Sequence, residues 1–186
     1  GARTCGAQIP KATDWAEVQF TTMNNIPAFP YVCGFEDAAE NGDWLFADKG
    51  EDVKFIVGGN NNNSVMTGDS ALYIADATNA YAYYDYGSSN VYAYRTLLFE
   101  PGDYQISFDW KCNGETERDF GRVFLAPIDI YVSAGTKIGA TELDVERYIR
   151  LHENDKLSGS PVWKGESTIV TIEEMTNYYL IVQWSN

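Results

Sequence analysis

Short stretches rich in β-branched and aromatic residues recur along this chain, each followed by a cluster of turn residues. Examples are "VKFIV", "ALYIA", "VYAYRTLLF", "DYQISFDWKC", "IDIYV" and "YYLIVQW", with turns such as "TGDS", "EPGD", "CNGE" and "SAGT" between them. Regularly spaced short strands and turns are typical of an all-β sandwich or barrel. The sequence therefore predicts an all-β fold, an antiparallel β-sandwich with little helix.

One segment competes with this interpretation. Residues 140–154, "ATELDVERYIRLHEN", place Val145, Tyr148 and Ile149 at helical spacing. The apolar stripe is thin for a helix that packs on a core, which is usually three or four residues per two turns. We expect a strand from Tyr148 to Leu151 instead.

The length of 186 residues suggests one domain with room for a core. Residues 1–30 differ from the rest, because Pro10, Pro27 and Pro30 interrupt them, and they are predicted to form a linker or an edge segment. Residues 31–186 are predicted to form the β-sandwich.

The chain is strongly acidic, with 27 Asp and Glu against 13 Lys and Arg and a formal net charge of −14. The basic residues are scattered singly, which argues against nucleic acid as a partner because phosphate binding needs clustered cations. No run of 18 apolar residues is present, so we expect no membrane-spanning helix.

Three cysteines stand at positions 5, 33 and 112. Cys112 shares strand parity with Phe108 and Trp110, which predicts a buried thiol. Cys5 and Cys33 can pair only if the N-terminal segment folds back, and the sequence leaves that pairing open. With no C-x-x-C pair, the cysteines do not complete a zinc site with the single histidine.

Tyrosines gather in "YAYYDYGSSNVYAYRT", residues 81–96. Alternation along "VYAYRTLLF" places Val91 and Leu97 on one face of a strand and Tyr92 and Tyr94 on the other. Most of these rings are expected to be strand filler, with cross-strand aromatic pairs. The candidates for an exposed ligand platform lie beside the "GSSN" turn and are Tyr84, Asp85 and Tyr86.

Two polar segments carry side chains that are chemically versatile. His152 lies in "LHENDKL" and is expected to be an exposed loop histidine. Arg118 and Arg122, in "GETERDFGR", could hold a carboxylate or a sugar, although a solvated hairpin end is the simpler expectation.

The segment "YVCGFEDAAENGDWLF", followed in order by "TGDSALYIA", "VYAYRTLLFEPGDYQISFDWKC", "RVFLAP", "KLSGSPVWKG" and "NYYLIVQWSN", resembles MAM-like and cleaved-adhesin-like jelly-roll domains of bacterial surface proteins. The resemblance covers residues 31–186. It implies a jelly-roll sandwich of the concanavalin-like or galactose-binding-like kind, serving as a secreted or cell-surface binding module within a larger polypeptide. Such domains usually continue past "WSN" into a last strand, so either that strand is missing here or residues 15–22 replace it.

The resemblance also implies a structural calcium near the Phe-Glu strand. Calcium takes six to eight oxygen ligands, largely carboxylates and carbonyls. The metal-ligand candidates carried over are Glu36 and Asp109, supported by Asp37 and Asp69, each of the last two being as readily explained as a turn residue.

A catalytic alternative rests on "TELDVERY". Its Glu142-x-Asp144-x-Glu146 spacing resembles the catalytic signature of laminarinase-type glycoside hydrolases, which are also jelly rolls. Retaining hydrolysis needs two carboxyl groups about 5–5.5 Å apart. The pattern arises easily in an acidic chain, so this enzyme is a minority interpretation.

The favoured interpretation is a non-catalytic, extracellular binding or adhesion module that recognises glycan. Aromatic rings stack on sugar faces, while carboxylates and amides meet the hydroxyls. Besides the tyrosine platform, Trp163 is predicted to be a ligand-binding ring in a loop, whereas Trp44 is expected to cap the core. A protein adhesion surface or a purely structural module is the alternative.

Overall fold

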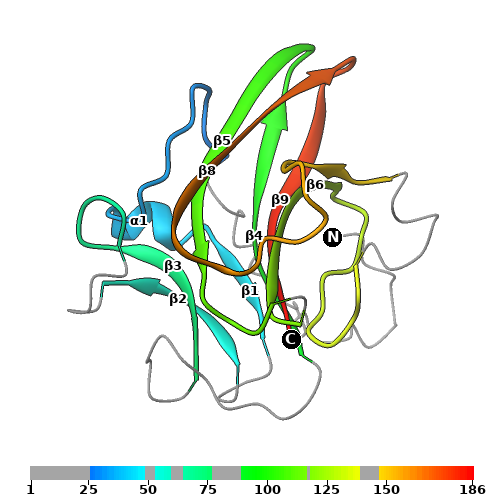
Figure 1. Ribbon diagram of the computed structural model, residues 1–186. Helices are drawn as coiled ribbons and strands as arrows, with labels where there is room; N and C mark the ends of the chain where they lie inside the picture. Colours follow the sequence, from blue (N-terminus) through cyan, green and yellow to red (C-terminus); the bar gives the residue numbers. More distant parts are fainter. Residues whose placement is uncertain (1–25, 49–52, 60–64, 77–88, 117, 139–146) are drawn as a thin grey trace, which may run out of the picture.

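The computed structural model describes residues 26–48, 53–59, 65–76, 89–116, 118–138 and 147–186. Within them the chain is almost entirely antiparallel strand, with a single turn of helix (Figure 1). The elements are α1 Ala38–Asn41, β1 Leu45–Ala47, β2 Lys54–Gly58, β3 Ala71–Ala75, β4 Asn90–Phe99, β5 Gly102–Cys112, β6 Phe120–Pro127, β7 Ile149–Arg150, β8 Ser160–Ile172 and β9 Thr176–Ser185.

The strands form a sandwich of two layers that differ in how their strands are paired. One layer is a five-stranded sheet in the order β1-β4-β9-β6-β7, and the other consists of two separate strand pairs, β2-β3 and β5-β8. The pair β5-β8 forms a long ribbon beside the sheet, and β2-β3 lies near its other end (Figure 1). The predicted antiparallel β-sandwich is confirmed.

Two apolar clusters fill the space between the layers. The first joins Leu97 and Phe99 of β4 to Val170 and Ile172 of β8. The second joins Val91 and Ala93 of β4 to Phe55 of β2, together with Trp44. Trp44 is buried, as expected for a core residue.

The opposite face of the five-stranded sheet is also covered. Tyr92, Phe124 and Ile181 form a third cluster there, against which Ile130 and Val132 pack. Because side chains alternate along β4, its odd positions serve the first two clusters and Tyr92 serves the third. The predicted alternation of β4 is confirmed, and Tyr92 is structural: its hydroxyl donates to the carbonyl of Thr136 and accepts from the amide of Ile138.

The segment "IDIYV", residues 128–132, is not a strand, which corrects the sequence prediction. It turns directly after Pro127, with the amide of Ile130 donating to the Pro127 carbonyl at 3.3 Å. Ile130 and Val132 pack on a sheet face, whereas Ile128 and Tyr131 are exposed. A loop that buries alternate apolar residues has the same composition as a strand.

The predicted strand at Tyr148–Leu151 is present in shorter form as β7. β9 is a central strand that pairs with β4 on one side and β6 on the other. The segment proposed to replace a missing last strand, residues 15–22, lies outside the described residues. No helix among the described residues is long and apolar enough to cross a membrane.

Candidate functional site

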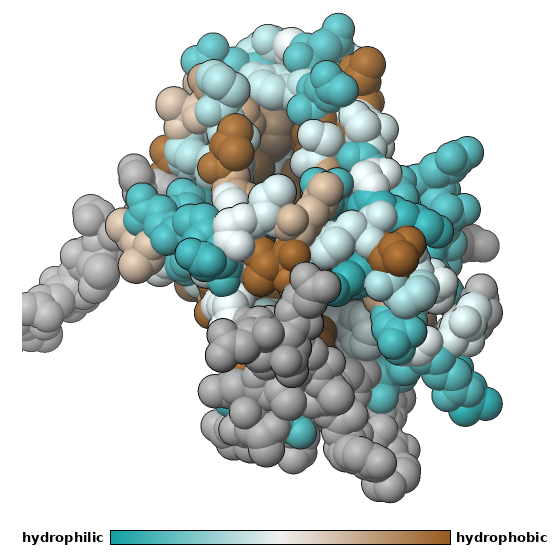
Figure 2. Space-filling model, turned by 60° about the vertical axis from the view of Figure 1, so that its left-hand side comes forward, coloured by the Kyte–Doolittle hydropathy of each residue, from teal (hydrophilic) through white to brown (hydrophobic). Residues whose placement is uncertain are grey.

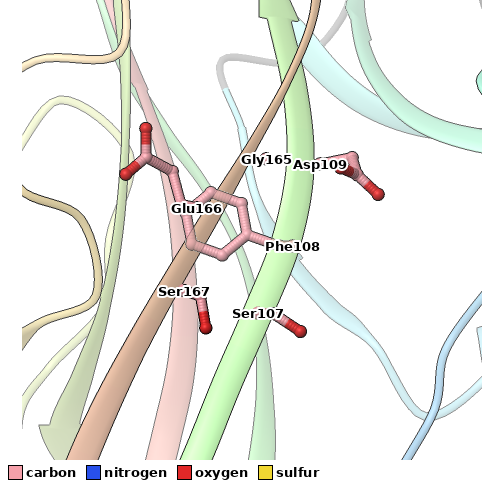
Figure 3. A pocket seen from close by; sticks show the side chains of 6 residues that line it. All are labelled: Ser107, Phe108, Asp109, Gly165, Glu166 and Ser167. Atoms are coloured by element: carbon pink, nitrogen blue, oxygen red, sulfur yellow. The ribbon is translucent and has the colours of Figure 1, made fainter.

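The β5-β8 ribbon has one face on the core and one face open to solvent. Its inner side chains from β5 are Tyr104, Ile106, Phe108 and Trp110, which pack against the first apolar cluster. The register places Asp109 opposite Gly165 and Ser107 opposite Ser167, and all four are exposed on the outer face. Figure 3 shows Ser107 and Asp109 projecting from one side of the β5 ribbon and Phe108 from the other. Strand alternation in "DYQISFDWK" therefore produces an apolar inner face and a polar outer face.

A shallow depression of about 290 Å³ lies on this ribbon (Figure 3). It is lined by two pairs of residues that face each other across the strands, and by the pair between them: Ser107, Phe108, Asp109, Gly165, Glu166 and Ser167. A Cβ atom added at Gly165 would stand 3.2 Å from Oδ1 of Asp109, closer than Cβ atoms normally approach a neighbour. The absence of a side chain at Gly165 thus leaves room beside the Asp109 carboxylate.

Polar groups continue along the outer face from this depression. The Gln105 amide donates to the Ser167 hydroxyl at 3.1 Å, and the Thr171 hydroxyl donates to Asp103 at 2.7 Å. At the other end stands Trp163, in the part of β8 where the register shifts between Trp110 and Cys112. Its ring lies against Lys111, which shares the outer face of β5 with Asp109. We call the outer-face residues Trp163, Gly165, Ser167, Ser107 and Asp109 the outer strip.

Trp163 lies in β8, so the expectation that it occupies a loop is wrong. The ring is half-buried, and Nζ of Lys111 lies 5.1 Å from its centroid. A cation in this position is attracted by the electron-rich ring face. The ring is thereby held at the end of the outer strip, with Gly165 two residues further along β8.

Trp110, the second tryptophan of the ribbon, lies on its inner face. Nε1 of Trp110 donates to Oε1 of Glu166 at 3.2 Å, and Nζ of Lys164 lies 5.6 Å from its ring centroid. Glu166 is opposite Phe108 in the register and therefore shares its face. The two carboxylates that line the depression, Asp109 and Glu166, consequently project from opposite faces of the ribbon (Figure 3).

Of the four calcium candidates, Glu36, Asp37 and Asp69 lie near one another around the start of α1, whereas Asp109 lies on β5. Oε1 of Glu36 accepts the backbone amides of Asp69 and Ser70 at 2.8 and 2.9 Å. Asp37 is the N-cap of α1 and accepts from the amide of Ala39 at 2.8 Å. Gly68 makes the close approach to Glu36 possible, since its φ is +73° and an added Cβ would stand 2.3 Å from Oε1.

Asp109 lies on the exposed face of β5, so its position in mid-strand carries no burial cost. Among the described residues, no three His, Cys, Asp or Glu side chains are grouped so that they could hold a metal ion. The structural calcium is not tested by these contacts and stays a prediction.

Several predicted site residues lie outside the described residues. These are the tyrosine platform Tyr84, Asp85 and Tyr86 and the hydrolase pattern Glu142, Asp144 and Glu146. Cys33 is a free, half-buried thiol, while Cys5 is also outside the described part of the chain. Cys112 is buried, as predicted from its strand parity.

His152 is buried with 4% of its surface exposed, so the expectation of an exposed loop histidine is wrong. Its Nδ1 contacts the Asn154 carbonyl, and its Nε2 is buried without a hydrogen-bond partner in the structure. Burial lowers the pKa of His152 below its usual range, and the nearby Arg150 and Arg122 act in the same direction. The segment "LHENDKL" looks exposed because most of its residues are polar. In the structure it is held against the protein by Leu151 and Leu157, which pack in the first cluster.

Comparisons with known proteins provide no family. No family model and no curated protein matches the chain. Among solved structures the chain is similar to TmCBM61, a carbohydrate-binding module in complex with β-1,4-galactotriose, at 12% sequence identity and a TM-score of 0.44, covering 77% of each chain. A likeness this distant carries no argument about function.

Proposed function

We propose that the protein is a non-catalytic glycan-binding module and that the outer strip is its binding surface. The observation that carries the proposal is the sequence of groups along one exposed ribbon face. A tryptophan ring is followed by a gap at Gly165 beside the Asp109 carboxylate, and then by the paired hydroxyls of Ser107 and Ser167.

Each of these groups has a role in sugar recognition. The ring of Trp163 offers an apolar surface for the face of a pyranose, and carboxylate or hydroxyl oxygens accept and donate hydrogen bonds to sugar hydroxyls. The space over Gly165 allows a ring to approach the backbone of β8. Because the depression is open, it fits a chain of sugars lying across it better than a pocket that encloses a single sugar would.

The hydrolase interpretation finds no support on the ribbon. Paired-carboxylate hydrolysis needs two carboxyl groups facing one bond, whereas Asp109 and Glu166 project from opposite faces. The pattern at Glu142, Asp144 and Glu146 stays the minority alternative. Hydrolysis of laminarin that is lost on Glu142→Gln would establish it in place of the binding module.

A protein adhesion role is the second candidate within the non-catalytic class. Protein-binding surfaces are commonly marked by contiguous apolar patches of several hundred Å². On the face drawn in Figure 2, apolar residues form separate small patches among hydrophilic ones. Secretion, a bacterial surface location, membership of a larger polypeptide and a structural calcium belong to the proposal as expectations from the family resemblance.

The experiment is a glycan array followed by calorimetric titration of the best oligosaccharide. Trp163→Ala and Gly165→Val are expected to weaken binding at least about tenfold, because one removes the stacking ring and the other fills the gap. Met175→Ala is the matched control, since Met175 is an exposed apolar residue between β8 and β9 and off the outer strip. Unchanged binding by folded Gly165→Val protein would overturn the assignment of the site.

A further inference from the structure

The exposed face of the β5-β8 ribbon extends beyond the outer strip. Ile169 follows Ser167 on the same face of β8 and lies opposite Gln105 of β5. The next pair along the ribbon is Thr171 and Asp103, whose side chains are hydrogen-bonded to each other at 2.7 Å. Ile169, Gln105, Thr171 and Asp103 are all exposed, so the outer face stays open to solvent past the depression.

Ile169 differs from its surroundings on this face. Its side chain is 72% exposed, whereas Val170, the next residue of β8, points to the core and is 4% exposed. At the other outward positions of the paired strands, residues 103 to 109 and 165 to 171, the side chains are polar or, at Gly165, absent. Strand formation does not require an aliphatic group here, because the polar Thr171 is β-branched as well. One exposed apolar residue is common by itself, so its meaning depends on the groups around it.

Gln105 is held in position beside Ile169. Its Nε2 donates to Oγ of Ser167 on the neighbouring strand at 3.1 Å. A side-chain amide has a second N–H group and a carbonyl oxygen, and in the described part of the chain neither of them is hydrogen-bonded to the protein. The amide therefore presents a donor and an acceptor side by side to solvent. Because the bond to Ser167 already restricts its rotamers, Gln105 loses less conformational entropy when a ligand binds.

Small residues separate this end of the face from the tryptophan end. Along β8, Gly165 and Ser167 lie between Trp163 and Ile169, and the depression of about 290 Å³ lies over them. Larger side chains consequently stand on both sides of the depression. The pair of Ile169 and Gln105 repeats the chemistry of the Trp163 end, which is an apolar surface beside hydrogen-bonding groups.

The length of the face decides which ligand can use both ends. Trp163 and Ile169 are six residues apart in β8, which corresponds to about 20 Å along an extended strand. A single sugar ring is much shorter than this distance and cannot contact both residues, whereas a chain of sugars that runs parallel to β8 can. Once one end of such a chain is bound, the second contact becomes intramolecular and adds to the affinity.

We propose that Ile169 and Gln105 form a second sugar subsite, so that the protein binds a linear glycan chain running parallel to β8 from Trp163 to Ile169. The aliphatic side chain contacts the C–H groups of one sugar, and the amide exchanges hydrogen bonds with its hydroxyls. Because the depression is open, the chain can continue past both ends, and the site recognises the interior of a glycan. This inference rests on the proposed function, since it extends the same surface.

The test is calorimetric titration with linear oligosaccharides of increasing length. A disaccharide, a tetrasaccharide and an octasaccharide are taken from each of laminarin, cellulose, mannan and xylan. Within the series that binds, the octasaccharide is expected to bind at least about tenfold more tightly than the disaccharide. Ile169→Thr combined with Gln105→Ala should reduce this ratio to about twofold, because the longer probe loses its additional contacts. Trp163→Ala should instead weaken the long and the short probe alike.

Ile128→Thr is the matched control, because it makes the same substitution at an exposed isoleucine in the loop after β6, outside the ribbon. Circular dichroism and thermal melting check that each variant is folded, and the exposed positions of Ile169 and Gln105 make folding of the double variant the expected result. Affinity that is independent of length, or an unchanged ratio in the folded double variant, would overturn the inference and leave the Trp163 site standing. Absence of binding in every series would also overturn it, while the glycan array decides the proposed function separately.

Discussion

β4 and β5 are consecutive strands of 10 and 11 residues, but only one of them has a face available to a ligand. β4 lies within the five-stranded sheet between β1 and β9, with apolar clusters on both faces. β5 pairs with β8 in a two-stranded ribbon whose outer face carries polar residues in solvent. The aromatic residues of β4 therefore serve packing, while the polar outer residues of β5 mark the candidate site.

The largest expected effect on stability comes from a substitution in the buried strand β4. Phe99→Ala removes a fully buried ring from β4 that contacts Tyr104 and Tyr178 at ring-centroid distances of 4.8 and 5.9 Å. Cavity formation should lower the free energy of unfolding by about 3–5 kcal/mol. Chemical denaturation would measure it. Ile169→Ala, on the exposed side of β8, should change stability by no more than about 0.5 kcal/mol, and a comparable loss at both positions would contradict the distinction.

A smaller effect is expected from a single hydroxyl. Tyr92→Phe keeps the ring in the third cluster but leaves the Thr136 carbonyl and the Ile138 amide without their side-chain partner. Unpaired buried groups cost about 1–3 kcal/mol, which denaturant unfolding resolves. Ser107→Ala removes a hydroxyl from the outer strip, where water replaces it, and should be almost neutral to stability. A stable Tyr92→Phe protein would mean that water satisfies both backbone groups.

The pH dependence of stability tests the segment between β7 and β8. Because burial lowers the pKa of His152, the unfolded chain binds a proton at that residue more readily than the folded chain does. Stability should therefore decline as pH falls below the unfolded value of about 6.5 and stop declining below the folded pKa. Thermal melting across this range would show the decline in the wild type, superimposed on the titration of carboxylates. His152→Gln should lack that component, and identical profiles for the two proteins would contradict the buried, neutral assignment.

Calcium is expected to have the smallest effect on stability. Oε1 of Glu36 is already committed to two backbone amides, so an ion at this turn would gain little from that oxygen. Adding millimolar calcium to chelator-treated protein is expected to raise the melting temperature by a few degrees at most, about 1 kcal/mol in a chain of this size. Glu36→Gln should abolish the rise. A rise that persists in Glu36→Gln would place the ion elsewhere.

Strand formation and the direction of side chains were determined by the sequence itself. Alternation along "VYAYRTLLF" and "DYQISFDWKC" correctly separates Tyr92 from Leu97 and buries Cys112, because local sterics impose a period of two on any strand. The turns after Phe99 and Cys112 were equally readable, since Gly and Pro restrict or permit particular backbone angles. The sandwich class followed from this local information.

Tertiary structure alone decided which faces remain open and which distant groups meet. Residues 128–138 cover the sheet face that carries Tyr92, whereas the outer face of β5-β8 exposes polar groups to solvent. Side chains alternate in the same way along both strands, so alternation could not distinguish the covered face from the open one. Burial of His152 and convergence of Arg122 with Asp155 depend on the Gly121–Leu157 pairing, which joins residues 36 positions apart. Local propensity carries no information about such contacts, because their energy comes from neighbours that only the folded chain brings together.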